Sequence, residues 1–158
     1  STNGTLYFTS EREGGEGGED ILRAIPENGV FVRIENAGRG VNTKGPEFNA
    51  WVAPDESYLL FSSQGREGEI GGGDLYISHR DGDGNFTPAR LFHEPINSTR
   101  LDYCPYVFGG RLYFTSARLT PIDGIESMAE LERVFGAVGN GFGDIYSVSV
   151  DEIAEFSR

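Results

Sequence analysis

Apolar residues in this chain gather in short runs that are bounded by glycine, proline, aspartate or serine. Four such runs occupy the middle of the sequence, at 48–52, 58–62, 74–78 and 89–92. The run at 58–62 shows no alternation, which is typical of a strand that is covered on both faces. The DGDG sequence at 81–84, between the last two runs, is a strong β-hairpin signal. This part of the chain therefore predicts a four-stranded antiparallel sheet.

The same pattern recurs along the chain. The sequence LYFTS at 6–10 returns as LLFSS at 59–63 and as LYFTS at 112–116, with an offset of 53 residues each time. A glycine-rich stretch that ends in an aspartate follows each copy. A third motif, in which Asn and a Thr or Ser precede an acidic-aromatic pair, occurs at 42–48 and 97–103. Three motifs in a constant order indicate internal repeats. The repeats cover about 1–46, 47–101 and 102–158.

The two end repeats are incomplete, because the first starts at its second strand and the third lacks its fourth. Four strands per unit and a period in the fifties are typical of a β-propeller blade. We therefore predict an all-β fold, with about three blades of four-stranded antiparallel sheet in one unit of residues 1–158. Closed propellers have about four to eight blades. The unit thus closes by homodimerisation, belongs to a longer ring or remains an open stack.

The third repeat carries an insertion at about 122–139. The sequence DGIE at 123–126 resembles a capping box, and apolar residues then follow helical spacing. These apolar residues are Ile125, Met128, Leu131, Val134, Phe135 and Val138. Gly136 and Gly139 are suited to end a helix. We expect a helix of about three turns that lies over one mouth of the propeller.

Composition narrows the range of functions. The chain has 13 Lys and Arg against 25 Asp and Glu, a net charge of −12, which argues against a nucleic-acid partner and against docking on anionic lipid. No apolar run approaches the roughly 18 residues of a membrane-spanning helix, and we identify no targeting signal in the chain. Cys104 is the single cysteine, so no intramolecular disulfide forms, and we expect it to be a small buried residue.

The sequence APDESYLLFSS at 53–63, followed by GDLY at 73–76, resembles the repeat of the TolB-like (WD40-like) β-propeller proteins of the bacterial envelope. Residues 103–146, which end in GDIY, are similar to the C-terminal repeat of such proteins. The resemblance covers nearly the whole chain except the insertion. It implies the C-terminal half of a six-bladed propeller, a periplasmic or otherwise extracytoplasmic bacterial location, and a role in binding proteins or as a scaffold. Similar propellers also gate peptidases or carry lyase sites.

Two residue types recur once in each repeat. The aspartates at the start of a strand are Asp20, Asp74 and Asp144. A metal or substrate ligand is one interpretation of them, but their presence in every repeat favours turn capping, since aspartate bonds local backbone amides. The arginines that follow the second strand are Arg12, Arg66 and Arg118. We expect each arginine to pair with one of these three aspartates, that of its own or of the adjacent blade.

Acidic, glycine-rich loops occupy matching positions in the first two repeats. Their glutamates are Glu11, Glu13, Glu16 and Glu19 in the first loop and Glu67 and Glu69 in the second. Oxygen-rich loops suit calcium, but the spacing matches no EF-hand. We therefore expect a solvated acidic surface and no cofactor or metal, with calcium as the alternative.

His79 and His93, the only histidines, are the candidates for a general base or metal ligand. We expect structural or surface roles for both, and the enzyme hypothesis requires that they meet a carboxylate in one pocket. No Gly-x-Ser-x-Gly elbow is present to support an α/β-hydrolase. Trp51 and Tyr106 occupy equivalent repeat positions, and we expect them to pack between blades.

The long loops share one face in a propeller, and loops on a rigid scaffold commonly carry function. The candidate binding residues on this face are Glu11, Arg12, Arg66, Glu67, His93 and Arg118. We expect a non-catalytic binding or scaffold module that holds a protein or peptide partner there, with the acidic rim steering a basic segment. One alternative is a propeller-type hydrolase or lyase acting on a peptide or saccharide. The other is an assembly domain that closes a propeller by homodimerisation.

Overall fold

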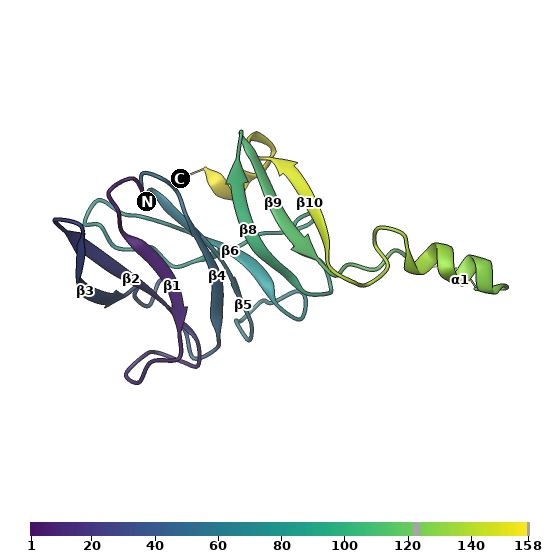
Figure 1. The fold of residues 1–158 in the computed structure, drawn as a ribbon, viewed down its shortest axis with the longest axis horizontal. Coiled ribbons are helices and arrows are strands. Elements are labelled where there is room, and N and C mark those ends of the chain that lie inside the picture. The colour runs from purple at the N-terminus through teal and green to yellow at the C-terminus, as the bar shows by residue number, and fades with distance from the viewer. Residues whose placement is uncertain (122–123, 158) are drawn as a thin grey trace.

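The structure, a computed structural model, describes residues 1–121 and 124–157. Ten strands in these residues form three antiparallel sheets that stand in a row (Figure 1). The first sheet contains β1 (Leu6–Ser10), β2 (Asp20–Glu27) and β3 (Val30–Asn36). The second contains β4 (Glu47–Val52), β5 (Tyr58–Ser63), β6 (Asp74–His79) and β7 (Arg90–Leu91). The third contains β8 (Asp102–Phe108), β9 (Arg111–Ser116) and β10 (Asp144–Ser149). The predicted all-β fold is confirmed, and the sheets do not close into a barrel.

Two hydrophobic cores hold the row together, one on each face of the middle sheet. The first core contains Ile21, Ala37, Val41, Leu59, Phe61, Tyr76 and Phe86. The second contains Leu60, Leu75, Ile77, Phe92, Ile96, Leu112, Phe114 and Ile153. Strands β5 and β6 contribute to both cores, because successive residues of a strand point to opposite faces. The unalternating apolar run at 58–62 is thus explained by a sheet between two neighbours.

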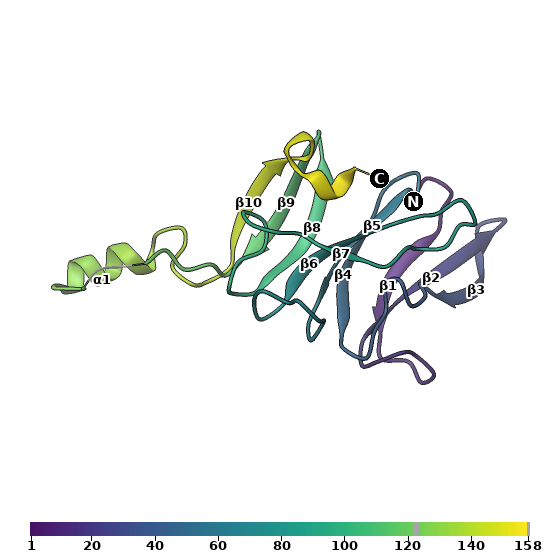
Figure 2. The same cartoon turned by 180° about the vertical axis from the view of Figure 1, so that it is seen from behind.

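The inner edges of the sheets, strands β1, β4 and β8, follow one another across the molecule (Figures 1 and 2). Strands β4 and β8 each contain a bulge at the equivalent position, where Asn49 and Cys104 both have a φ of 53°. The expectation that Cys104 is buried was wrong, because the bulge leaves its side chain exposed. Beyond the bulge, the rings of Trp51 and Tyr106 meet edge to face at 6.1 Å, which is the expected contact between neighbouring repeats.

The insertion contains one helix, α1 (Met128–Phe135), which is shorter than predicted. Ser127 caps its start by accepting from the backbone of Glu130, and the helix ends at Gly136 as expected. The capping box predicted from Asp123 lies outside the described residues. The helix projects away from the sheets and buries none of its residues, so the expectation that it covers a propeller mouth was wrong (Figures 1 and 2). An antiparallel β-bridge between Leu119 and Asn140 joins the segments that lead into and out of the insertion.

The two flanks of the row expose apolar side chains, as expected for a stack that does not close. On the first sheet these are Leu6, Val30, Phe31, Val32 and Ile34, and on the third Tyr106, Phe108 and Ile145. Side chains of this size rarely stay exposed in a cluster without a partner. No helix among the described residues is long and apolar enough to cross a membrane.

Candidate functional site

Polar residues gather at the end of the sheets where β1, β5 and β9 stop, which we call the polar end. Here Glu47, the fully buried first residue of β4, lies opposite Ser63 of β5. The Ser63 hydroxyl donates to Oε1 of Glu47 at 2.9 Å, and Nη2 of Arg66 lies 3.1 Å from the same oxygen. Nε of Arg66 donates in turn to the Ser63 hydroxyl at 2.9 Å. An acid, a serine and an arginine therefore form one closed cluster.

The third sheet repeats this cluster. Asp102, the fully buried first residue of β8, lies opposite Ser116 of β9. Nη2 of Arg118 lies 3.4 Å from the Asp102 carboxylate, and its Nε donates to the Ser116 hydroxyl at 2.8 Å. We call each of these clusters an acid clamp. The clamp of the second sheet is Glu47, Ser63 and Arg66, and the clamp of the third sheet is Asp102, Ser116 and Arg118.

Each clamp arginine also joins two sheets. The guanidinium of Arg66 lies 5.1 Å from the ring centroid of Phe61 and 4.9 Å from that of Tyr76, within the range of cation–π attraction. It donates to the carbonyl of Val41, in the linker that arrives from the first sheet. A planar, delocalised guanidinium can stack and donate at once, which explains why the position holds arginine.

Arg118 makes the equivalent contacts between the second and third sheets. Its guanidinium lies 5.4 Å from the centroid of Phe114 and 4.4 Å from that of Tyr146. It donates to the carbonyls of Pro95 at 2.9 Å and Ile96 at 2.6 Å, in the linker from the second sheet. The clamps are therefore parts of the contact between sheets as well as of each sheet.

The expected pairing of these arginines with Asp20, Asp74 and Asp144 was wrong. The three aspartates instead accept backbone N–H groups of their own loops, from Glu16 at 2.7 Å, Ile70 at 2.6 Å and Gly139 at 2.8 Å. These contacts are those of turn capping. The arginines pair instead with Glu47 and Asp102. These acids lie opposite Ser63 and Ser116, and each arginine follows one of these serines closely in the sequence. The acidic residue of the third sequence motif is the signal from which these partners could have been predicted.

The Asn and Thr or Ser of that motif connect each clamp to the preceding sheet. The side chain of Asn97 is buried, accepts from Leu75 N at 2.8 Å and donates to Leu75 O at 3.0 Å. Asn42 binds the backbone of Ile21 in the same way, at 2.9 and 2.8 Å. Thr43 then donates to Glu47 through its backbone N–H at 2.8 Å and its hydroxyl at 2.6 Å.

Asp74 is a buried acid of the polar end with one unpaired carboxylate oxygen. Burial raises its pKa above the usual value, against the backbone amides of Ile70 and Gly71, which lower it. Its Oδ1 has no hydrogen bond among the described residues. Burial and the neighbouring Asp74 carboxyl also raise the pKa of Tyr76 to about 12. The described residues contain no group of three or more His, Cys, Asp or Glu side chains that could hold a metal ion.

Both histidines contact the C-terminal segment. Nε2 of His79 lies 2.9 Å from the backbone carbonyl of Glu155, and Nδ1 of His93 lies 3.1 Å from the Glu155 carboxylate. His93 and Glu155 line one pocket that His79 does not reach. Phe156 of the same segment packs on Tyr58 at 5.3 Å between ring centroids. The two histidines therefore hold the end of the chain against the second sheet.

The acidic loops lie at the polar end, before β2 and before β6 (Figure 1). Glu11, Glu13 and Glu67 are exposed and make no ion pair or side-chain hydrogen bond with any described residue. Glu16 pairs with Arg39 at 3.1 Å, and Glu69 accepts from the backbone of Gly65 at 2.8 Å. Unpaired carboxylates therefore remain at the tips of two loops.

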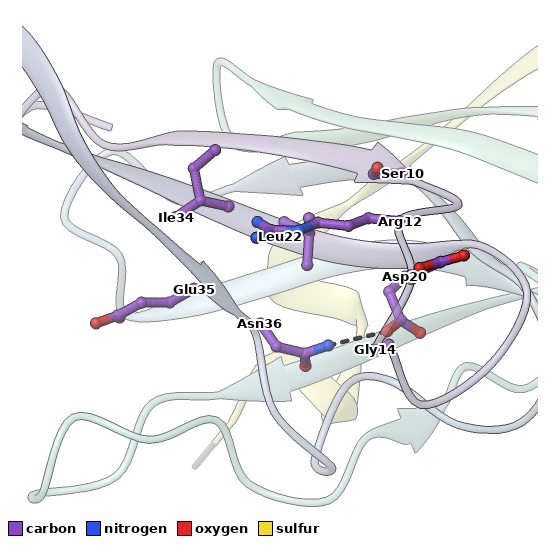
Figure 3. Close-up of a pocket in the computed structure, with 10 residues that line it drawn as sticks. Ser10, Arg12, Gly14, Asp20, Leu22, Ile34, Glu35 and Asn36 are labelled. Carbon is purple, nitrogen blue, oxygen red and sulfur yellow. Dashed lines mark hydrogen bonds between the residues drawn. The ribbon is translucent and has the colours of Figure 1, made fainter.

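Arg12, in the loop that follows β1, lines a pocket of about 200 Å³ (Figure 3). Ser10, Leu22, Ile34 and Asn36 line the same pocket. Arg12 is exposed and makes no ion pair or hydrogen bond within residues 1–121 and 124–157. It is the only one of the three repeated arginines that binds no acid in the described part of the chain. A scan of protein-family models finds no match to this sequence, and neither does a search of the curated proteins.

Proposed function

We propose that the chain is a non-catalytic binding or scaffold module, built as part of a TolB-like β-propeller, which holds a protein or peptide partner on its acidic long-loop face. The observation that carries this proposal is the set of exposed, unpaired carboxylates of Glu11, Glu13 and Glu67 at the polar end. A propeller of the bacterial envelope would place this face outside the cytoplasm, and we include that location in the proposal.

The loops that carry these carboxylates are anchored. Asp20 caps the first loop through Glu16 and Gly17, and Asp74 caps the second through Ile70 and Gly71. Beneath them, the acid clamps join the sheets. A charged surface held on ordered backbone loses little conformational entropy when a partner binds. The net charge of −12 adds long-range attraction for a basic segment.

The histidine contacts support a non-catalytic role. A general base must reach the proton that it removes, whereas His79 is buried against the C-terminal segment and His93 is engaged by Glu155. The uncovered apolar flanks support a second candidate, an assembly domain that closes a ring with another copy. A solution mass of twice 17.3 kDa would favour that candidate.

The test uses a synthetic lysine- and arginine-rich peptide and stopped-flow measurement of its association rate. We expect the rate to fall about tenfold or more as the salt concentration rises from ~10 mM to ~1 M. Replacing Glu11, Glu13 and Glu67 together by Gln should lower the low-salt rate several-fold. The control with the same change in net charge replaces Glu27, Glu94 and Glu152, which lie outside these loops. Equal rates for the two triple variants, or a rate independent of salt, would contradict the proposal.

A further inference from the structure

The first sheet holds the receiving half of an acid clamp. By repeat position, Ser10 corresponds to Ser63 and Ser116, and Arg12 corresponds to Arg66 and Arg118. Ser10 lies opposite Asp20 in the sheet, just as Ser63 lies opposite Asp74. Both Ser10 and Arg12 line the pocket of Figure 3. The serine and arginine are therefore in place, and the acid is absent.

The missing acid has a defined position. In the filled clamps it is the first residue of a strand that runs antiparallel to β5 or β9, directly opposite the serine. Strand β1 pairs only with β2, so its other edge is unpaired within the described chain. An unpaired edge presents a row of free N–H and C=O groups to an added strand.

Other acids in the pocket do not replace it. The Asp20 carboxylate accepts from the Glu16 and Gly17 backbone and from Asn36 at 2.9 Å. Glu35 pairs with Arg23 at 2.8 Å and with Arg33 at 2.6 Å. Glu13 also lines the pocket, and no ion pair joins it to Arg12. The Arg12 guanidinium thus stays available for a carboxylate supplied from outside.

We propose that the free edge of β1 is a strand-acceptor site, which takes an extended antiparallel segment whose first residue is a Glu or Asp bound by Ser10 and Arg12. The occupant is a polypeptide segment from outside residues 1–158. In a second copy, the strands of the required type that the described residues form are β4 and β8, and both acids are already buried in their own clamps.

The filled strands define the chemistry of the occupant. They read EFNAWV at 47–52 and DYCPYV at 102–107, so an acid and an aromatic residue come first, and a second aromatic residue and Val follow a bulge. An Asn five residues before the acid binds the preceding sheet in both cases. Because it lies beside β1, the occupant also covers part of the exposed side chain of Leu6. The Arg12 carboxylate site sets its register, because a slip by one residue would turn every side chain to the wrong face.

The test uses a fluorescent peptide with the sequence of residues 41–53, added to the intact chain, with fluorescence anisotropy as the readout. We expect saturable binding and slower amide hydrogen exchange in residues 6–10. The same peptide with E47Q should bind about tenfold more weakly, because a charge-assisted contact to Arg12 is lost. Since this comparison changes the peptide alone, the protein fold is the same in both arms. A scrambled peptide should not bind.

The reciprocal change is Arg12→Gln in the protein, with Arg100→Gln as the control of equal charge. Arg100 is exposed, lies in the linker before β8, and makes no ion pair among the described residues. Arg12→Gln should weaken binding of the parent peptide about tenfold and leave binding of the E47Q peptide unchanged. Arg100→Gln should change the binding of neither peptide.

Three results would overturn the proposal. The first is no saturable binding of the parent peptide up to about 1 mM, and the second is equal binding of the parent and E47Q peptides. The third is a dimer of the chain in which residues 6–10 are already protected, since the edge would then be occupied by a second copy. Failure of the basic-peptide test would leave this proposal standing, because that test concerns Glu11, Glu13 and Glu67 and this one concerns Ser10 and Arg12.

Discussion

Replacement of Glu47 by Gln tests whether the acid clamps hold the sheets together. The Glu47 carboxylate is fully buried, and its partner Arg66 has only 11% of its side chain exposed. Oε1 accepts from Thr43, Ser63 and Arg66, and Oε2 accepts from the Thr43 backbone N–H. Gln keeps the shape and one acceptor oxygen but removes the charge, and it turns an N–H₂ group toward the Thr43 N–H.

The size of the loss follows from these contacts. A buried backbone donor without an acceptor costs about 1–3 kcal/mol. Removing one partner from a buried ion pair costs about 3–5 kcal/mol in total, because the other charge stays desolvated. Arg66 keeps its contact with the Val41 carbonyl, which places the expected loss in the free energy of unfolding at about 3 kcal/mol.

Urea unfolding followed by circular dichroism measures this loss. With an m-value of about 2 kcal/mol/M, the midpoint should fall by about 1.5 M. The matched control is Glu35→Gln. The Glu35 carboxylate pairs with Arg23 and Arg33, and its side chain is 30% exposed. The control should lose less than about 1 kcal/mol. If both variants lose the same amount, the clamp is no more than a surface ion pair and the reasoning is refuted.

Two further predictions concern the loops and the C-terminal segment. Gly71→Ala should lower the thermal midpoint by several degrees, because a Cβ there would collide with the backbone carbonyls of Ser98 and Arg100. Gly72→Ala should change the midpoint little, since the space around Gly72 is open. Equal midpoints for the two variants would contradict this. Burial acts to raise the pKa of Glu155, but hydrogen bonds from His93 and nearby backbone outweigh it and hold the pKa below its ordinary value. Its stabilising contribution is therefore present above the unfolded pKa of about 4.5 and is lost as the pH falls through the lower folded value. Thermal unfolding between pH 6 and pH 3 should show a steeper loss for the unmodified chain than for Glu155→Gln, and parallel curves would show that the contact contributes nothing.

The strands could be predicted from the sequence because the same strand pattern occurs in each of the three repeats. The predicted runs at 58–62 and 74–78 match β5 and β6 to within one residue, since these strands end at Ser63 and His79. The roles of glycine in the repeated loops also have a local cause. A Cβ at Gly17 or Gly71 would meet carbonyls of the following linker, so the close approach of two loops requires glycine at these positions.

The partners of the arginines and the position of the helix could not be predicted in this way. Spacing alone did not distinguish Asp74 from Glu47 as the partner of Arg66, since register decides which acid faces the serine. The apolar positions of the insertion do follow helical spacing, but they carry no information about which surface, if any, the helix covers. The exposure of Cys104 depends on a bulge, and of the two bulge residues only Asn49 is of a type that commonly adopts a positive φ.

Each repeat carries its own polar contacts to the preceding sheet. For the second sheet, the linker Asn, the acid that opens β4 and the arginine after β5 make such contacts, beside the hydrophobic core that the two sheets share. An in-frame duplication of residues 47–101 would therefore carry a complete set of joints with it, and each added unit would be stabilised chiefly by its nearest neighbour. Tandem growth or shortening of such an array by whole units leaves every remaining junction chemically unchanged.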